Sequence, residues 1–245
     1  MQEVCIVIPC FNEARRLGGD DLLAFLSSSP HAHLCLVDDG STDGTLEALR
    51  HVQRREPGRI HVLRLEQNTG KAQAVRAGVL HVASLESFAF IGYWDADLST
   101  PLGEVDHLLE ALNRNPSCQL ALGSRVKRLG SSIERRPGRH VLGRIFAACA
   151  SGILGVSVYD SQCGAKIFRT GVVPTLFREP FLTRWLFDLE MLVRLRGRTG
   201  TLPTESTIEV PLRRWREMGG SKLTVRDMIR VPRELLAIRK HYQPK

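Results

Sequence analysis

The sequence predicts an α/β fold, a single domain whose mostly parallel central sheet is flanked by helices on both faces. Two observations predict it. Apolar runs recur through the first half at intervals of about thirty residues, the length of a strand–helix–strand unit. Amphipathic, helix-like stretches fill the gaps between these runs. Because the runs are apolar along nearly their whole length, they are typical of parallel strands that are buried on both faces.

Strands and helices alternate along the first half. The strands are expected at Val4–Pro9, Leu34–Asp38, His61–Leu65, Phe88–Trp94 and Leu120–Gly123. The helices between them are expected at Asp21–Leu26, Thr45–Arg54, Lys71–Leu85 and Glu104–Leu112. In the second of these helices, Leu46 and Leu49 form an apolar side and leave Glu47 and Arg50 for solvent, which is the pattern of a helix packed on a sheet.

The second half has a less regular pattern. Helices are expected at Gly138–Gly155, Leu186–Arg196 and Leu223–Tyr242, and a strand at Thr207–Leu212. The last helix carries apolar residues at helical spacing among arginines, and Pro232 is expected to kink it. We expect residues 1–222 to form the main domain, with 1–122 and 123–222 as its halves. Residues 223–245 would form a basic amphipathic helix that either lies in a membrane interface or packs on the domain.

The charge is divided unevenly between the halves. The chain has 245 residues, of which 43% are hydrophobic and 24% charged, and this composition excludes collagen, low-complexity disorder and a disulfide miniprotein. Residues 1–122 hold 10 basic and 16 acidic residues, a net charge of −6. Residues 123–245 hold 24 and 10, a net charge of +14. This division predicts two ligands of different electrostatic type.

Cysteine usage and hydropathy bear on the compartment. The six cysteines form no CxxC pair, and three lie in apolar strand-like runs, as buried free thiols of a reducing cytosol do. Glu3, Asn12 and Glu13 interrupt any signal-peptide core. The longest uncharged stretch, Ile145–Tyr159, is shorter than the about 20 residues that span a bilayer. We expect a cytoplasmic protein that is soluble or lies on a membrane without crossing it.

Polar segments follow four successive predicted strands. They are Pro9–Glu13, Asp38–Thr45, Asn68–Lys71 and Asp95–Asp97. In open α/β sheets, ligands bind outside the carboxyl ends of the strands. The four segments therefore predict a binding crevice at that edge.

Asp95 and Asp97 are the candidate metal ligands in this crevice. They follow an apolar strand, and residues two apart in an extended segment point to the same face, so both carboxylates could approach one cation. Mg²⁺ or Mn²⁺ takes few carboxylates and completes its shell with phosphate oxygens and water. The structural alternative is an ordinary turn, because turns often carry aspartate.

Asp38 and Asp39 end the second predicted strand in succession. Capping of the next helix explains the nearby Asp43, and Ser41 or Thr42 could serve the same purpose. Capping does not explain two acids at a buried strand end, since burying an unpaired charge is costly. We therefore expect a ligand with ring N–H and ribose hydroxyl donors to satisfy Asp38 and Asp39.

These motifs, in this order, resemble family 2 glycosyltransferases with the GT-A (nucleotide-diphospho-sugar transferase) fold. The resemblance rests on Ile8–Glu13, Val37–Thr45, Asn68–Lys71 and Asp95–Asp97, which span nearly the whole first half. Segments of the second half look like polyprenyl-phosphate (dolichyl-phosphate) hexose synthases. These segments are Gly123–Arg125, Arg135–Arg139, Asp160–Phe168 and Gly219–Leu223. The segment that begins at Asp160 looks closest to the dolichyl-phosphate beta-glucosyltransferase branch, with mannose synthases as the near neighbours.

The resemblance implies a role for each matching residue. Nucleotide-sugar roles fall on Pro9, Asn12 and Glu13 in the pocket, Asp38 at the base, Asp39 at the ribose, Gly70 and Lys71 near the sugar diphosphate, and Asp95 and Asp97 at the Mg²⁺ or Mn²⁺ ion. Acceptor-phosphate roles fall on Arg125 and Arg139, with Arg136 as a further candidate. Arg216 and Lys222 would lie on a loop that closes over the diphosphate. Lys166 could instead be only a structural ion-pair partner.

Two departures from the family pattern affect these expectations. Ser99 stands where mannose synthases often have a metal-binding glutamine, so the third metal ligand stays open. The usual membrane-spanning tail is not found in the sequence, so attachment to the membrane would be peripheral or through a membrane-protein partner.

The resemblance implies an inverting transfer of a hexose to a polyprenyl phosphate at the cytoplasmic face of a membrane. Glucose from UDP-glucose is the first expectation, and mannose from GDP-mannose the second. A family 2 enzyme could instead glycosylate a saccharide hydroxyl, with an aspartate as base. A nucleic-acid-binding module is the alternative from another class, but the chain has no reader motif and only 6% aromatic residues, so we expect no nucleic-acid partner.

Overall fold

The computed structural model describes residues 2–134, 151–152, 155, 158–199, 206–218 and 225–242. The first half contains β1 (Val4–Cys10), α1 (Gly19–Ser28), β2 (Ala32–Asp39), α2 (Thr45–Arg55), β3 (Ile60–Leu65), α3 (Lys71–Ser84), β4 (Phe90–Trp94), α4 (Glu104–Arg114) and β5 (Leu120–Ser124). The second half contains β6 (Ser132–Glu134), β7 (Ala165–Arg169), the 3-10 helix η1 (Thr170–Val172), α6 (Val173–Phe177), α7 (Phe187–Thr199), β8 (Thr207–Pro211), β9 (Arg214–Arg216) and α9 (Val225–Tyr242).

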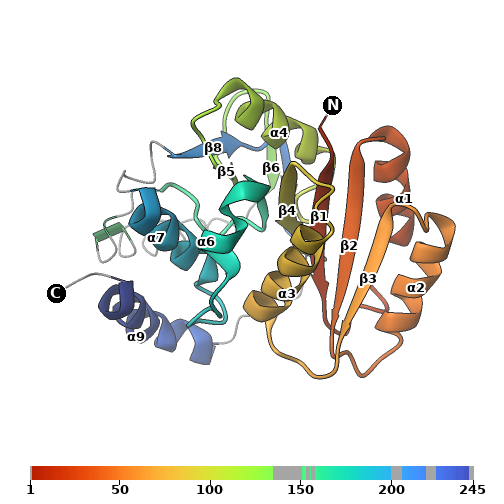
Figure 1. The fold of residues 1–245 in the computed structure, drawn as a ribbon, viewed down its shortest axis with the longest axis horizontal. Helices are drawn as coiled ribbons and strands as arrows, with labels where there is room; N and C mark the ends of the chain where they lie inside the picture. The colour runs from red at the N-terminus through yellow and green to blue at the C-terminus, as the bar shows by residue number, and fades with distance from the viewer. Residues whose placement is uncertain are drawn as a thin grey trace.

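The central sheet has seven strands in the order β3-β2-β1-β4-β7-β5-β8 (Figure 1). The strands β1 to β4 pair in parallel, as do β5 and β8, whereas β7 runs antiparallel to both of its neighbours. Strands β6 and β9 form a separate two-stranded sheet. The mostly parallel sheet that the sequence predicts is confirmed, and the parallel strands bring their carboxyl ends to one edge.

The two faces of the sheet carry two apolar cores. Successive residues of β1 alternate between them, because side chains of a strand point to opposite faces. Val7 packs in the core that α3, α6 and α7 cover, and its neighbours Ile6 and Ile8 pack in the core under α1, α2 and α4. All three side chains are almost completely buried. The prediction of helices on both faces is therefore confirmed.

The elements of the first half lie where the sequence predicts them, with ends that differ by at most two residues. The second half departs more. Strand β7 was not predicted, although it fills the gap between β4 and β5. The helix expected at Gly138–Gly155 falls mostly outside the described residues; Ser151 and Gly152 are helical.

Helix α9 packs on the domain beside α7 (Figure 1). Leu235 and Ile238 are buried in the core, and the Tyr242 hydroxyl lies 2.7 Å from Glu190 Oε1 and 2.8 Å from Arg194 Nε. The helix continues across Pro232. Over residues 231–242, Leu235 and Ile238 thus pack on the domain, whereas Leu236 is exposed. The expected contact of this helix with a membrane interface stays a prediction. The division at residue 222 stays a prediction.

The described part of the chain contains five cysteines, all of them buried and none in a disulfide bond. None of the helices in the described ranges is long and apolar enough to span a bilayer.

Candidate active site

The loops after β1 and β2 are joined by hydrogen bonds that use side-chain oxygens. Asn12 Oδ1 accepts the N–H of Thr42 at 2.9 Å, and Ser41 Oγ accepts the N–H of Asn12 at 3.0 Å. The N–H of Glu13 donates to Thr45 Oγ1 at 2.8 Å. Asn12 has a φ of 53°, a left-handed conformation that asparagine tolerates well. These contacts join two loops about thirty residues apart in sequence into one wall, which we call the loop wall, at the edge where the sequence predicts a crevice.

Pro9 and Asp38 lie at the base of this wall. Pro9 pairs with Val37 in the β1–β2 ladder, one position before Asp38. Asp38 is buried, and its Oδ1 accepts the N–H of Ser41 at 3.1 Å. The ends of both strands are thereby fixed relative to the loop wall.

Asp39 is satisfied by the chain itself. Its Oδ1 accepts the N–H and the hydroxyl of Thr69 at 2.7 and 2.8 Å, and its Oδ2 accepts the N–H of Gly70 at 2.9 Å and Asn68 Nδ2 at 3.0 Å. Only 3% of Asp39 is exposed. From the sequence, a ligand was expected to supply these donors; this expectation is wrong, because the loop after β3 supplies all four.

Asp95 and Asp97 lie in a turn that follows β4. The N–H of Leu98 donates to the carbonyl of Asp95 at 3.1 Å, so this segment forms a turn, whereas the sequence pattern had predicted an extended segment. Asp97 Oδ1 accepts the N–H of Ser99 at 2.9 Å. Trp94 Nε1 donates to the carbonyl of Thr100 at 3.0 Å, which holds the end of the loop in place. Both aspartates are half-buried. The turn thus presents two carboxylates that are fixed in place and still partly open.

Lys71 forms an ion pair with this turn. It begins α3, and its Nζ lies 2.5 Å from Asp95 Oδ1. Burial alone would lower the pKa of Lys71, but the carboxylates of Asp95 and Asp188 outweigh burial and raise it. Gly70, directly before it, has a φ of 86°, which disfavours any residue with a Cβ. The turn at Gly70 therefore places a permanent positive charge against Asp95.

A buried charge cluster lies beneath the turn. Lys166 is fully buried, and its Nζ lies 2.7 Å from Asp188 Oδ1 and donates to the carbonyl of Cys163 at 2.6 Å. The Tyr93 hydroxyl donates to the same oxygen of Asp188. Burial is the main cause that lowers the pKa of Lys166 and raises the pKa of Asp188. These contacts favour the structural role for Lys166.

Arg125 follows β5 and forms a bidentate ion pair. Its Nε and Nη2 each lie 2.6 Å from an oxygen of Asp160, and its guanidinium stacks on the Trp215 ring, 5.4 Å from the centroid. Its side chain is 15% exposed. Burial would lower its pKa, but hydrogen bonds and charge from Asp160 raise it. Arg125 was expected to face the acceptor phosphate, whereas here its charge is compensated within the chain.

The other site residues predicted in the second half are Arg136 and Arg139 for the acceptor phosphate, and Arg216 and Lys222 for the loop over the diphosphate. The N–H of Arg216 donates to the carbonyl of Ser99 at 2.9 Å, which ties β9 to the Asp95–Asp97 turn. The Arg216 side chain is exposed, and its Nε lies 3.5 Å from Glu134. Arg136, Arg139 and Lys222 lie outside the described residues.

Two residues of the crevice were missed. The carbonyl of Gly164 accepts the N–H of Asp95 at 3.0 Å, and a Cβ at Gly164 would overlap the Asp95 carboxylate. Arg184 Nη2 donates to Asn68 Oδ1 at 3.3 Å and lies against Gly70. Gly164 lies in the Asp160–Phe168 motif, but no sequence pattern indicates that it packs against Asp95. Arg184 is an isolated arginine with no signal of its own.

The donor set fits a hard divalent ion that a ligand helps to hold. Among the described residues, no group of three or more His, Cys, Asp or Glu side chains could bind a metal. Asp95 and Asp97 would therefore contribute two carboxylates, and the remaining oxygen ligands would come from phosphates and water. Mg²⁺ and Mn²⁺ accept such a shell.

Comparison with known proteins decides the family. The model for "Glycosyl transferase family 2" matches residues 5–181, most of the chain. This chain belongs to glycosyl transferase family 2. The resemblance of its loop motifs to that family is thereby confirmed, and the family 2 enzyme can be compared with individual relatives.

Curated relatives resemble the enzyme over nearly its whole length. Dolichyl-phosphate beta-glucosyltransferase ALG5C from Trichomonas vaginalis is 31% identical over 246 residues, which cover 95% of this chain and 69% of the relative. The human dolichyl-phosphate beta-glucosyltransferase is 28% identical, with 98% and 76% covered.

A solved structure confirms the fold. Glucosyl-3-phosphoglycerate synthase from Mycobacterium tuberculosis, in complex with Mn²⁺, UDP-glucose and phosphoglyceric acid, superposes with a TM-score of 0.68 at 18% identity. The superposition covers 98% of this chain and 80% of the other.

Proposed function

We propose that this family 2 glycosyltransferase transfers glucose from UDP-glucose to a polyprenyl or dolichyl phosphate, with Mg²⁺ or Mn²⁺ at the Asp95–Asp97 turn. One observation carries the proposal: the carboxylates of Asp95 and Asp97 stand half-buried at the carboxyl edge of the sheet, with Lys71 beside Asp95. The names of the relatives support the sugar and the acceptor. The complex of the synthase with Mn²⁺ and UDP-glucose supports the donor and the metal.

The donor would bind against the loop wall. Pro9, Asn12 and Glu13 would line the nucleotide pocket, with Asp38 at its base. Asp39 would shape the ribose side indirectly, because it holds the Asn68–Gly70 segment in place. Lys71 and Arg216 would then compensate the charge of the diphosphate.

The acceptor needs no separate base. A phosphate monoester has a second pKa of about 6, so at pH 7 its oxygen is already a competent nucleophile. That oxygen would attack the anomeric carbon while the bond from this carbon to the diphosphate oxygen breaks, with inversion, and UDP leaves with the electron pair. A bound Mg²⁺ or Mn²⁺ would neutralise charge on the departing diphosphate. Asp95 and Asp97 would orient the diphosphate through that ion.

The basic half would recruit the acceptor at the cytoplasmic face of a membrane. Anionic lipid surfaces attract basic protein segments. Arg139 and Arg136 remain our candidates for binding the acceptor phosphate, and Lys222 for closing over the diphosphate. Arg125, paired with Asp160, would position this side of the crevice.

A donor and acceptor panel tests the proposal. The purified chain is incubated in detergent with Mn²⁺, labelled UDP-glucose or GDP-mannose, and a polyprenyl phosphate. We expect a glucosylated lipid that requires UDP-glucose, the phosphorylated lipid and the metal together. Product only from GDP-mannose would replace the donor assignment, and product only on a saccharide hydroxyl would replace the acceptor. No lipid-linked product with either donor would overturn the proposal.

A further inference from the structure

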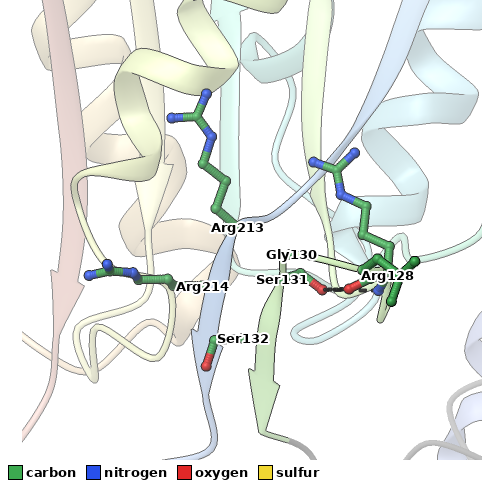
Figure 2. A pocket seen from close by; sticks show the side chains of 7 residues that line it. Arg128, Gly130, Ser131, Ser132, Arg213 and Arg214 are labelled. Carbon is green, nitrogen blue, oxygen red and sulfur yellow. Dashed lines mark hydrogen bonds between the residues drawn. The ribbon is translucent and has the colours of Figure 1, made fainter.

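A basic hollow lies on the acceptor side of the sheet, where the chain leaves β5 and β8 (Figure 2). Its volume is about 650 Å³, and its lining comes from the turn that leads into β6 and from the residues that lead into β9, with the first residue of each strand. The residues that line it are Arg128, Leu129, Gly130, Ser131, Ser132, Arg213 and Arg214. No role described above uses any of them.

A hydrogen-bonded turn holds one rim of this hollow. The N–H and the hydroxyl of Ser131 donate to the carbonyl of Arg128 at 3.1 and 2.8 Å, and the N–H of Arg128 donates to Ser131 Oγ at 2.9 Å. Gly130 supplies the left-handed conformation, with a φ of 83°. Leu129 lies between Arg128 and Gly130, and its relative accessible surface is 103%, so it is fully exposed. The turn therefore holds an apolar side chain out into solvent.

The surroundings of Leu129 are strongly basic. Arg128, Arg213 and Arg214 are exposed, and Lys127 precedes the turn. Among the described residues that line the hollow, none is acidic. Single exposed leucines are common on protein surfaces, but this one stands on a fixed turn within a cluster of cations. An apolar tip among cations is suited to the headgroup layer of an anionic membrane.

The hollow adjoins the crevice through two elements. Arg125, which borders the acceptor side, lies three residues before Arg128. Strand β9 begins at Arg214, and its Arg216 is hydrogen-bonded to the turn that carries the paired aspartates. A membrane that contacts this rim would therefore lie next to the acceptor side.

We propose that the turn Arg128–Ser131, together with Arg214, docks the enzyme on an anionic membrane, with Leu129 inserted among the headgroups. This inference rests on the proposed function, because it names the surface at which a lipid acceptor would be met. A polynucleotide would also attract the arginines, but it offers no apolar layer for Leu129. The lipid is therefore the occupant that explains both features.

Vesicle cosedimentation tests the docking surface. The full chain is mixed with phosphatidylcholine vesicles, with or without phosphatidylserine. The variant R128S/R214S should bind anionic vesicles about 25-fold more weakly, since each basic residue near the surface contributes about fivefold. Arg213 is left unchanged because it also lines a second cavity with Asp106 and Glu110. L129S should weaken binding by about tenfold, through lost apolar burial.

Matched controls lie far from the turn. R50S/R54S removes the same charge from exposed positions of α2, and L85S removes an exposed leucine at the opposite edge of the sheet. Both controls should bind vesicles like the unchanged protein. The proposal would be overturned if L129S and R128S/R214S bound anionic vesicles as tightly as the unchanged protein does. It would also be overturned if the unchanged protein bound no vesicles but bound an oligonucleotide, and the variants lost that oligonucleotide binding.

A second readout separates this inference from the proposed function. With a short polyprenyl phosphate dissolved in detergent, the two docking variants should turn over like the unchanged enzyme. If the unchanged enzyme has no such activity, the proposed function fails, whatever the vesicles show. If it is active and the docking variants still bind anionic vesicles normally, only the docking surface fails.

Discussion

Asp39 and the Asp95–Asp97 pair stand at the ends of β2 and β4, the two strands that flank β1, on one edge of the sheet, yet their surroundings differ. The Asp39 carboxylate accepts four hydrogen bonds from the loop after β3 and is almost fully buried. Asp95 contacts Lys71, and Asp97 accepts one backbone N–H, while both remain half-buried. The first carboxylate shapes the crevice, and the other two can still take a ligand.

The two places differ in how many hydrogen-bond donors the chain itself supplies to the carboxylates. A buried carboxylate must be hydrogen-bonded or paired, because leaving it unsatisfied costs free energy. Around Asp39 the chain meets this demand. Around Asp95 and Asp97 it does so only in part, which leaves oxygen atoms for a cation and a diphosphate. Substitutions should therefore affect folding at the first position and turnover at the second.

The largest effect is expected for Asp97→Asn. The amide would weaken metal binding, so kcat/KM for glucosyl transfer should fall by about 100- to 1000-fold. The free energy of unfolding in urea should stay close to that of the unchanged protein, because the Asp97 side chain is half-buried and accepts a single backbone bond. Asp20→Asn, on the exposed start of α1, is the matched control. Full activity in Asp97→Asn would refute the metal role.

Lys166→Met should come next in size. Removing one partner of a buried ion pair leaves the Asp188 charge uncompensated, and the expected loss of unfolding free energy is about 3 kcal/mol. The double variant K166M/D188N should recover much of this loss, since the amide removes the buried charge and can still accept the Tyr93 hydroxyl. Urea unfolding measures both. If the double variant were no more stable than K166M, the loss would not come from the unpaired charge.

Asp39→Asn should cost about 2 kcal/mol of unfolding free energy, because one carboxylate oxygen that accepts two hydrogen bonds becomes a donor. Thr69→Val removes only the hydroxyl bond and should cost about 1 kcal/mol. Affinity for UDP should fall in Asp39→Asn as the Asn68–Gly70 segment loosens. A variant as stable as the unchanged protein would show that Asp39 does not hold this loop.

The smallest effect concerns pH and arises at the opposite edge of the sheet. Burial lowers the pKa of His33 and of His61 in the folded protein. The unfolded chain therefore binds more protons below its histidine pKa of about 6.5, and stability should fall as the pH drops through that value. His33→Gln should flatten this slope in urea unfolding at several pH values. An unchanged slope would assign it to other groups.

The sequence predicted structural features that depend on one continuous segment, but it did not predict contacts between segments that are distant in the chain. The parallel strands, the helix bounds and the positions of the loop motifs follow from local periodicity and turn chemistry. Strand β7 was missed because its pairing with β4 and β5 is antiparallel and joins segments far apart in the chain. The donors to Asp39 come from residues about thirty positions away. The partner of Arg125, Asp160, is likewise remote.

Calorimetric titration of Mn²⁺ into the protein with UDP tests the central claim most directly. The unchanged protein should bind Mn²⁺ with UDP much more tightly than without it, because the two carboxylates need phosphate oxygens to complete the shell. Asp97→Asn should lose this coupling while unfolding at the same urea concentration. Equal Mn²⁺ affinity with and without UDP, or unchanged coupling in Asp97→Asn, would contradict the account.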